Sequence, residues 1–378
     1  MKLLFLTGSR SDWGYIKPIL TLCKKKNIKY TLCVTNMHVL DSFGLTSNEI
    51  KNDGFQIHEE IYMTLDGYNN FTTSKSLGIF IQSFSDILHR EKPDWIVLAG
   101  DRSETLAACI SAAYSNIPIA HIQAGELSGN IDGQARHAIG KFAHIHFASN
   151  LDAAERLKKL GEQEFRIKNV GAPQIDDIKN LKAKNQKKIF FDLGIHKIKD
   201  FFLIALHPVT EEVNKTISHF KIFNKALNKF NNPKIWILPN SDPGSYTLKT
   251  EILNNKKNDT HIFDNLERDV YLQIMKNCEI IIGNSSSGII ESTFLKKPAI
   301  NIGRRQHKRL KAGNVIDVDL FDEKKIVKAI NRGISKKFKN KVVKIKSLYG
   351  DGNSSEKIIN LLKSIKLDDK MLFKELTY

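Results

Sequence analysis

The most restrictive feature of this sequence is an alternation of short apolar segments with longer amphipathic ones along most of the chain. Short, continuously apolar strands that alternate with helices are typical of parallel sheets covered by helices on both faces. The expected strands are Lys2–Thr7, Tyr30–Thr35, Trp95–Ala99, Ile117–His121, Ile145–Ala148, Phe201–Ala205, Lys234–Leu238, Glu279–Ile282 and Pro298–Ile302. The expected helices include Ile16–Lys26, Ser103–Tyr114, Asp152–Leu160 and Ser354–Lys366. The pattern predicts an α/β protein.

The strand–helix series occurs twice, which predicts two domains. Between the two series lies Pro173–Lys188, whose Lys-rich second half has no strand pattern. We interpret it as the linker into the opening helix of the second domain. We expect an N-terminal Rossmann-like domain over residues 1–173, a second one over residues 174–355 and a helical tail over residues 356–378. Two such domains with a central cleft would bind ligands at the carboxyl ends of their strands.

The composition is that of a globular protein rather than a membrane or disulfide-rich one. Of the 378 residues, 41% are hydrophobic and 26% are charged, which is ordinary for a globular chain. No apolar run approaches the roughly 20 residues that span a bilayer. The opening strand is followed too soon by Arg10 and Asp12 for a signal peptide. The four cysteines are scattered without C-x-x-C spacing, so we expect a reducing, cytoplasmic location.

The net charge of +17 raises the question of a nucleic-acid partner. The excess is mostly lysine, spread over surface-like stretches such as Lys179–Lys199 and Arg332–Lys346. No helix-turn-helix, zinc-finger or aromatic-basic RNA pattern accompanies it. We therefore interpret the charge as a solvated surface that can also assist capture of an anionic nucleotide, and expect no nucleic-acid partner.

Two motifs of the first half follow expected strands. Gly8 and Arg10 come after the first strand, where backbone N–H groups at a helix start can bind an anion and Arg10 can pair with phosphate. The G-x-G-x-x-G fingerprint of dinucleotide sites is absent, and an ordinary strand–helix turn explains the residues equally well. Asp101 and Arg102 follow the strand Trp95–Ala99. Asp101 can be a helix cap or a general acid or base.

A third motif runs from His121 to Asp132 and contains Glu126 within a glycine-containing loop. Converging carboxylates suit the removal and delivery of protons. The structural alternative is that Asp132 caps a helix over Gly133–Phe142 and that the nearby histidines are structural. His144 and His146 have strand spacing and no H-x-x-x-H partner, so we expect no metal site.

The second half repeats this arrangement. His207 lies just after the strand Phe201–Ala205 and can hold phosphate, move a proton or be structural. Asn240 lies in a turn-rich loop after the next strand. The segment Gly283–Gly288 has three serines between glycines, which suits a diphosphate at a helix start, although the serines can also be caps. Glu291, on the helix that follows, can accept hydrogen bonds from ribose hydroxyls.

Together these motifs resemble the hydrolysing UDP-N-acetylglucosamine 2-epimerases of sialic-acid and legionaminic-acid biosynthesis. The resemblance extends from Met1 to about Asp319, and no single motif carries it. The most specific pieces are Gly8-Ser9-Arg10, Gly100-Asp101-Arg102, Gly125-Glu126 through Arg136-His137, His207-Pro208, Gly283-Asn284-Ser285-Ser286 with Glu291, and Gly303-Arg304-Arg305-Gln306. At Ala124 and Gly133 this chain departs from the residues that many members of the family carry. Both positions lie beside the expected sugar site, so they bear on the identity of the sugar.

The resemblance implies a GT-B type fold and assigns roles to individual residues. It implies that Asp101, Glu126 and Asp132 carry out catalysis. His207 is expected to take part in catalysis, to bind phosphate, or both. The residues it implies for substrate binding are Arg10 and Arg102 near the diphosphate, and His207, Asn240, Ser285, Ser286, Glu291 and Arg305 for UDP. It also implies a homo-oligomer, a dimer or a tetramer.

The reaction implied is the conversion of UDP-N-acetylglucosamine to N-acetylmannosamine and UDP. UDP is eliminated across carbons 1 and 2, and the resulting glycal is hydrated. This chemistry requires no metal, nicotinamide or other cofactor. The alternatives are the same reaction on UDP-2,4-diacetamido-2,4,6-trideoxyglucose, a non-hydrolysing epimerase, a GT-B glycosyltransferase with an acceptor, and a nucleotide-sugar sensor without turnover.

Overall fold

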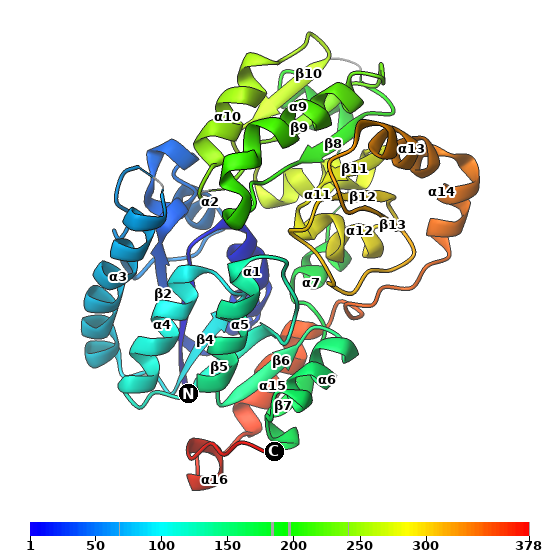
Figure 1. Ribbon diagram of the computed structural model, residues 1–378. Helices are drawn as coiled ribbons and strands as arrows, with labels where there is room; N and C mark the ends of the chain where they lie inside the picture. Colours follow the sequence, from blue (N-terminus) through cyan, green and yellow to red (C-terminus); the bar gives the residue numbers. More distant parts are fainter. Residues whose placement is uncertain (68, 183–184, 196–197, 241, 378) are drawn as a thin grey trace. The chain divides into compact units, whose positions relative to one another are not determined.

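The computed structural model describes residues 1–67, 69–182, 185–195, 198–240 and 242–377 (Figure 1). These form two compact units. The first comprises Met1–Leu127, Ile131–Lys179 and Tyr349–Tyr378, and the second Ser128–Asn130 and Asn180–Leu348. Each unit has one wholly parallel sheet. The predicted pair of Rossmann-like domains is confirmed.

The sheet of the first unit has seven strands in the order β3-β2-β1-β4-β5-β6-β7. The strands are β1 Lys2–Thr7, β2 Lys29–Thr35, β3 Glu59–Ile61, β4 Trp95–Ala99, β5 Ile119–Ala124, β6 Ile145–Ala148 and β7 Ile167–Asn169. Alternate residues of β1 enter different cores, Leu3 and Phe5 on one face and Leu4 and Leu6 on the other. Both faces are therefore covered, which explains the continuous apolar runs.

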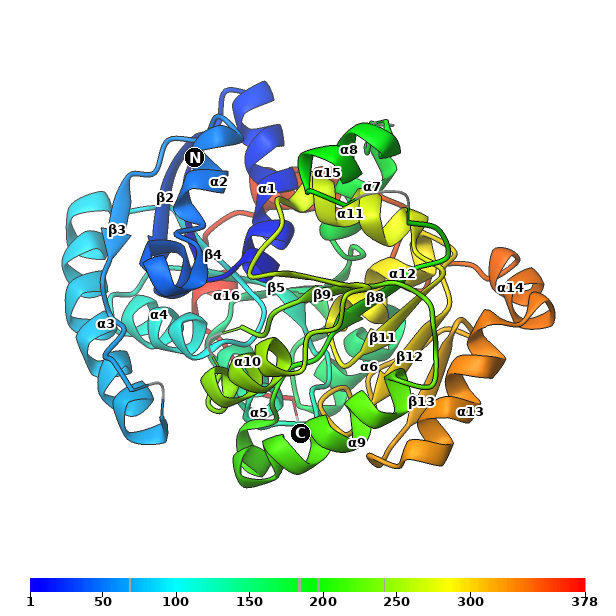
Figure 2. The same ribbon diagram turned by 90° about the horizontal axis from the view of Figure 1, so that it is seen from above.

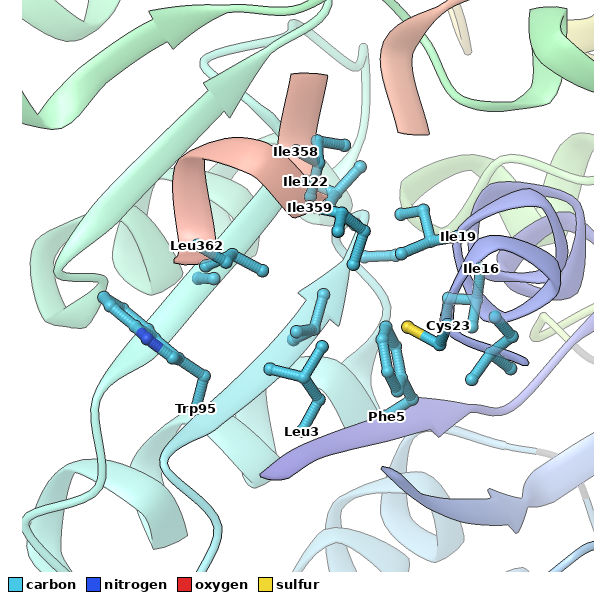
Figure 3. Close-up of a cluster of buried hydrophobic side chains, with 14 of the residues drawn as sticks. Leu3, Phe5, Ile16, Ile19, Cys23, Trp95, Ile122, Ile358, Ile359 and Leu362 are labelled. Carbon is cyan, nitrogen blue, oxygen red and sulfur yellow. The ribbon is translucent and has the colours of Figure 1, made fainter. Parts of the chain in front are cut away.

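The helices of the first unit cover both faces of its sheet. They are α1 Arg10–Lys25, α2 Ser47–Asn52, α3 Asn70–Glu91, α4 Ser103–Tyr114, α5 Ile131–Phe142, α6 Leu151–Lys159, α7 Gln174–Lys179, α15 Ser354–Ser364 and α16 Asp369–Leu372. α15 packs against α1 although the two are far apart in sequence. Figure 3 shows Ile358, Ile359 and Leu362 of α15 in one buried cluster with Leu3 and Trp95. α15 thus completes the core of the first unit.

The unit boundaries differ by a few residues from the domain ranges that we expected. Residues 174–179, which form α7, belong to the first unit, and so does everything after Leu348. Buried contacts explain both assignments: the Ala172 N–H donates to the Tyr349 carbonyl, and the Asp176 carboxylate accepts from the N–H groups of Ser354 and Ser355. Residues 183–184 of the expected linker lie outside the described residues.

The sheet of the second unit has six strands in the order β10-β9-β8-β11-β12-β13. The strands are β8 Phe202–Ala205, β9 Lys234–Ile237, β10 Thr260–Phe263, β11 Ile280–Gly283, β12 Ala299–Ile302 and β13 Val315–Val318. The helices are α8 Gln186–Asp192, α9 Thr216–Leu227, α10 Ser245–Asn254, α11 Arg268–Asn277, α12 Ile290–Phe294, α13 Glu323–Ile334 and α14 Lys336–Val343. α13 packs on β12 and β13 (Figure 2).

In each sheet the order of the strands reverses at one point. There the chain returns to the other side of the first strand of that sheet and adds the remaining strands in the opposite direction. In the first sheet this point lies between β1 and β4, and in the second between β8 and β11. In open parallel sheets the loops at such a switch point diverge and leave room for a ligand. The strand order therefore predicts that ligand-binding residues lie in the loops that follow β1, β4, β8 and β11.

The strands that the sequence pattern missed are β3, β7, β10 and β13, the outermost strands of the two sheets. They are short and partly exposed, and β3 and β7 carry charged side chains. β5 begins two residues and ends three residues later than expected, and its extension beyond His121 includes the buried polar residue Gln123. Within the described part of the chain, no helix combines the length and apolar character needed to cross a membrane.

Candidate active site

The residues predicted for the first domain all follow the carboxyl ends of adjacent strands of its sheet. Arg10 opens α1 after β1, Asp101 and Arg102 join β4 to α4, and Glu126 follows β5. Asp132 lies in the first turn of α5, which begins at Ile131, so Asp132 does not cap a helix over Gly133–Phe142. Strand order therefore gathers at one sheet edge residues that are up to 122 positions apart in sequence.

A buried acidic cluster supports the turns after β1 and β4. Arg102 donates from Nε to Glu104 Oε1 at 2.8 Å, and the Glu104 side chain is fully buried. Asn36 Nδ2 donates to the same oxygen at 3.1 Å. Asp12 Oδ2 accepts from the Ser9 hydroxyl at 2.9 Å and faces the Gly8 N–H. Burial raises the pKa of Asp12 to about 7, with Arg102 opposing the shift.

Asp101 is held by a buried arginine that the sequence analysis left without a role. Arg136, from α5, donates to Asp101 Oδ2 and, at 3.0 Å, to the carbonyl of Gln123. Burial lowers the pKa of Arg136, but the Asp101 and Glu126 carboxylates outweigh burial and raise it overall. Both predicted acids therefore lie within the electrostatic reach of one guanidinium.

Glu126 is buried and held by neutral donors. Its Oε1 accepts hydrogen bonds from the Ser149 hydroxyl and the Asn150 carboxamide, both directly after β6. Only 2% of Glu126 is exposed. Asn150 also caps α6 through the Ala153 N–H at 2.8 Å, so its orientation is fixed by the fold. These hydrogen bonds fix the orientation of a buried carboxyl group directly beyond the carboxyl end of β5.

His121 and His146 are fully buried and each contacts a polar group of the first unit. His121 Nε2 lies 2.7 Å from the Gly100 carbonyl, and burial lowers its pKa to about 3. His146 lies 2.9 Å from Glu162, and burial lowers the pKa of its imidazole. The Lys374 ammonium lies 2.5 Å from Glu162 Oε2, so this buried carboxylate contacts both Lys374 and His146. Among the described residues, no group of three or more His, Cys, Asp or Glu side chains is placed to hold a metal ion.

In the second unit, Asn284 joins the turns after β8 and β11. Its carboxamide accepts from the His207 N–H at 2.7 Å and donates to the His207 carbonyl at 2.9 Å. Gly283 allows this close approach, because a Cβ at its φ of +144° would lie 2.0 Å from the Ala205 carbonyl oxygen. His207 Nδ1 accepts from the Asn240 N–H at 3.3 Å. The neutral ring therefore carries its proton on Nε2.

Arg305 and Asp242 meet at the same edge. Arg305 Nη2 lies 3.5 Å from Asp242 Oδ2, and Nη1 donates to the Asn284 carbonyl at 3.4 Å. Its buried Nε has no partner among the described residues. Asp242 also accepts from Asn240 Nδ2 at 2.6 Å. A mostly buried guanidinium with an unused donor at a sheet edge is suited to bind an anion. Ser241 lies outside the described residues.

The serine turn after β11 is ordered by α11. Ser285 caps the short helix Ser286–Gly288, and its hydroxyl lies 3.0 Å from that of Ser287. Ser287 in turn contacts the Tyr271 hydroxyl at 2.6 Å. Ser286 is partly exposed at this turn. A cavity of about 10 Å³, room for one water, lies beneath it and is lined in part by Ala205, Gly283, Ser285, Gly288 and Asn301.

The comparison with known protein families decides the identity at family level. Residues 21–363 match the model of the UDP-N-acetylglucosamine 2-epimerase family. This chain belongs to that family. It is also 35% identical to the hydrolysing UDP-N,N'-diacetylbacillosamine 2-epimerase of Legionella pneumophila over 99% of this chain and 98% of that protein.

A second relative supports membership of the epimerase family, and a solved structure shares the fold. The hydrolysing GDP/UDP-N,N'-diacetylbacillosamine 2-epimerase of Campylobacter jejuni is 34% identical over 97% of this chain and 96% of that protein. The crystal structure of the UDP-GlcNAc 2-epimerase of Neisseria meningitidis bound to UDP-GlcNAc matches with a TM-score of 0.83, at 20% identity over 97% of this chain and 100% of that one. The predicted GT-B type fold is thereby confirmed.

The fold of this epimerase-family member brings together two groups of predicted residues. One is at the carboxyl edge of the first sheet: Arg10, Asp101, Arg102, Glu126 and Asp132. The other is at the carboxyl edge of the second: His207, Asn240, Ser285, Ser286, Glu291 and Arg305. The sequence pattern did not indicate the side chains that contact these groups, namely Glu104, Arg136, Ser149, Asn150, Asp242, Arg268 and Tyr271. Ser149 and Asn150 directly follow β6, and this position was a signal in the sequence, whereas Arg136, Arg268 and Tyr271 lie on helices.

Proposed function

We propose that this chain is a hydrolysing UDP-hexosamine 2-epimerase. It eliminates UDP across carbons 1 and 2 of an N-acetylated UDP-hexosamine and then adds water to the glycal, releasing the 2-epimeric free sugar. Membership of the epimerase family supports the proposal, and so do the two relatives at 35% and 34% identity, whose names carry the hydrolysing activity.

The observation that carries the proposal is the placement of Asp101 and Glu126 around Arg136. Elimination and hydration each require a proton to be removed and another to be delivered. Asp101, fixed by the guanidinium, and Glu126, bound by Ser149 and Asn150, offer two carboxyl groups in different surroundings. We assign Asp132, in the first turn of α5, to the same set. The proposal assigns the proton transfers to these three carboxyl groups together.

In this proposal the second unit holds the UDP moiety. Arg305 binds the diphosphate with its unused Nε and exchanges Asp242 for phosphate. His207 donates from Nε2 to the diphosphate. Ser285 and Ser286 supply hydroxyl and N–H donors at the helix start, and Asn240 borders the site. Glu291 accepts from ribose hydroxyls. Arg10 and Arg102 of the first unit stabilise the charge of the departing diphosphate. The proposal includes no cofactor or metal.

Two sugars are candidates for the hexosamine. The names of the relatives from Legionella and Campylobacter favour UDP-N,N'-diacetylbacillosamine, the 2,4-diacetamido-2,4,6-trideoxy sugar nucleotide. UDP-N-acetylglucosamine, which the sequence analysis put first, is supported by the description of the family model and by the Neisseria structure bound to that nucleotide. We propose the diacetamido sugar as the preferred substrate.

The test is to incubate the protein with each nucleotide and to follow UDP release, with NMR of the freed sugar in D₂O. We expect release of UDP and a free sugar with inverted carbon 2 that carries deuterium there. Asp101→Asn and Glu126→Gln should abolish release while UDP binding persists, and the exposed Asp86→Asn on α3 serves as the matched control.

Each rival reaction has a different product. A non-hydrolysing epimerase would return an epimeric UDP-sugar without net release of UDP. A glycosyltransferase would release UDP only with an acceptor, and a sensor would bind the nucleotide without turnover. Full activity of Asp101→Asn or Glu126→Gln would refute the assignment of the acids.

A further inference from the structure

Glu291 is a buried carboxylate that uses only one of its two oxygens within the protein. It lies in the first turn of α12 and is 5% exposed. Its Oε1 accepts from Nη2 of Arg268, whose side chain is 11% exposed. Among the described residues, no hydrogen bond reaches Oε2. An acceptor left open in this way can bind donors such as hydroxyl groups.

Arg268 is placed to fix the orientation of that carboxylate. It is the first residue of α11, whose next turn contacts the serine segment through Tyr271 and Ser287 at 2.6 Å. Burial raises the pKa of the Tyr271 phenol, which keeps it a neutral hydroxyl. α11 is thus attached to the segment after β11 at two points one turn apart, and the Arg268–Glu291 pair cannot shift without the helix.

The chemistry of the pair determines what Oε2 can bind. The guanidinium provides the counter-charge that a buried carboxylate requires. The pair as a whole is neutral, so a second cation gains little there, whereas hydroxyl groups that donate to a carboxylate form strong, charge-assisted hydrogen bonds. A vicinal diol has two hydroxyl donors on adjacent carbons. One carboxylate oxygen in a fixed position can accept a hydrogen bond from each of them.

We propose that Arg268 is a positioning residue that orients Glu291 toward the ribose diol and so gives this protein its preference for ribonucleotides over 2'-deoxyribonucleotides. The proposal rests on the proposed UDP site. Arg268 does not touch the nucleotide itself and acts only through Glu291. Loss of Arg268 should therefore affect the 2'-hydroxyl contact more than the rest of UDP binding.

The experiment is calorimetric titration of the whole protein with UDP and with 2'-deoxyuridine 5'-diphosphate. The wild-type protein should bind UDP more tightly, by about tenfold or more, the worth of one hydrogen bond to a charged group. Glu291→Gln should reduce this ratio toward one, and Arg268→Gln should reduce it to a similar extent. Arg268→Lys, which keeps the charge, should restore part of the ratio and guards against misfolding of the glutamine variant.

Arg332→Gln, an exposed arginine on α13, is the matched control and should keep the wild-type ratio. A wild-type ratio in folded Arg268→Gln would overturn the inference, and so would equal binding of the two nucleotides by the wild-type protein. If the wild-type protein bound neither nucleotide, the proposed function itself would fail, which is a distinguishable result.

Discussion

The Asn284 carboxamide forms two hydrogen bonds with the backbone of His207, one to each polar group of that residue, at 2.7 and 2.9 Å. This amide joins the loops on the two sides of the switch point of the second sheet. Only 1% of Asn284 is exposed. We therefore predict that Asn284→Ala lowers the free energy of unfolding by about 1–3 kcal/mol, because two partly buried backbone groups lose their bonds to the carboxamide.

The same variant should weaken UDP binding, since His207 and the serine turn are no longer held together. Chemical denaturation and UDP titration measure the two effects. Asn231→Ala, an exposed asparagine in the same unit, is the control and should change neither. Unchanged stability of Asn284→Ala would show that water replaces the amide and that the switch point does not depend on it.

A second prediction contrasts two glycines of the first unit. A Cβ on Gly8 would lie 2.1 Å from Glu104 Oε1, whereas a Cβ on Gly78 would meet no atom within 4 Å. Glu104 cannot move freely because Arg102 and Asn36 hold it. Gly8→Ala should therefore destabilise the protein by about 1–3 kcal/mol. Gly78→Ala, in the middle of α3, should stabilise it by about 1 kcal/mol.

Thermal denaturation of the two variants measures this contrast. Gly8→Ala should also weaken UDP-sugar binding, because displacement of Glu104 displaces Arg102. The double variant Gly8→Ala, Glu104→Ala removes the clash but leaves Arg102 and Asn36 without their buried partner, so it should recover neither the stability nor the binding. Equal stability of Gly8→Ala and Gly78→Ala would contradict the packing described for the turn after β1.

A third prediction concerns Arg136 and Asp101. Arg136→Met leaves Asp101 without its buried counter-charge, and breaking such a pair from one side costs about 3–5 kcal/mol of stability. Asp101→Asn, Arg136→Met together should be more stable than Arg136→Met alone, since no unpaired charge remains. A double-mutant cycle by urea denaturation measures the coupling.

UDP release by Arg136→Met should fall sharply, because Asp101 loses its orientation. Arg90→Met removes an arginine from an exposed pair with Glu59 on the same unit and should leave both stability and activity almost unchanged. Additive effects of the two changes in the cycle would mean that Arg136 acts through Gln123 rather than through Asp101.

The sequence predicted the central strands because burial on both faces requires continuous apolar runs, as in β1 and β11. It missed β3 and β7 since an edge strand, half exposed, can carry glutamate, lysine and asparagine without loss. The return of α15 to the first unit had no local signal either. Ile358 and Ile359 have helical period, but which sheet they cover is decided by packing far from them in sequence.

The same division holds for the candidate site. Groups that follow a strand directly, such as Asp101 and Ser285, could be predicted because the fold places all such positions at one sheet edge. Arg136 and Arg268 could not, since each lies on a helix and meets its carboxylate only in three dimensions. A salt bridge between elements leaves no spacing pattern in a single sequence. The supporting groups therefore came only from the structure.

The last prediction concerns the pH dependence of stability and rests on His121. Burial lowers the pKa of His121 to about 3 in the folded protein, against about 6.5 in an unfolded chain. Between these values only the unfolded state binds the proton, so acidification favours unfolding by up to about 1.4 kcal/mol per pH unit for this group.

His121→Gln keeps a donor for the Gly100 carbonyl and cannot titrate, so its free energy of unfolding should fall less steeply from pH 6 to pH 4. Urea denaturation at several pH values measures the slope, with the exposed His89→Gln as the control. A slope equal to that of the wild-type protein would show that His121 is already protonated in the folded state, and hence that its ring is not the neutral donor to Gly100.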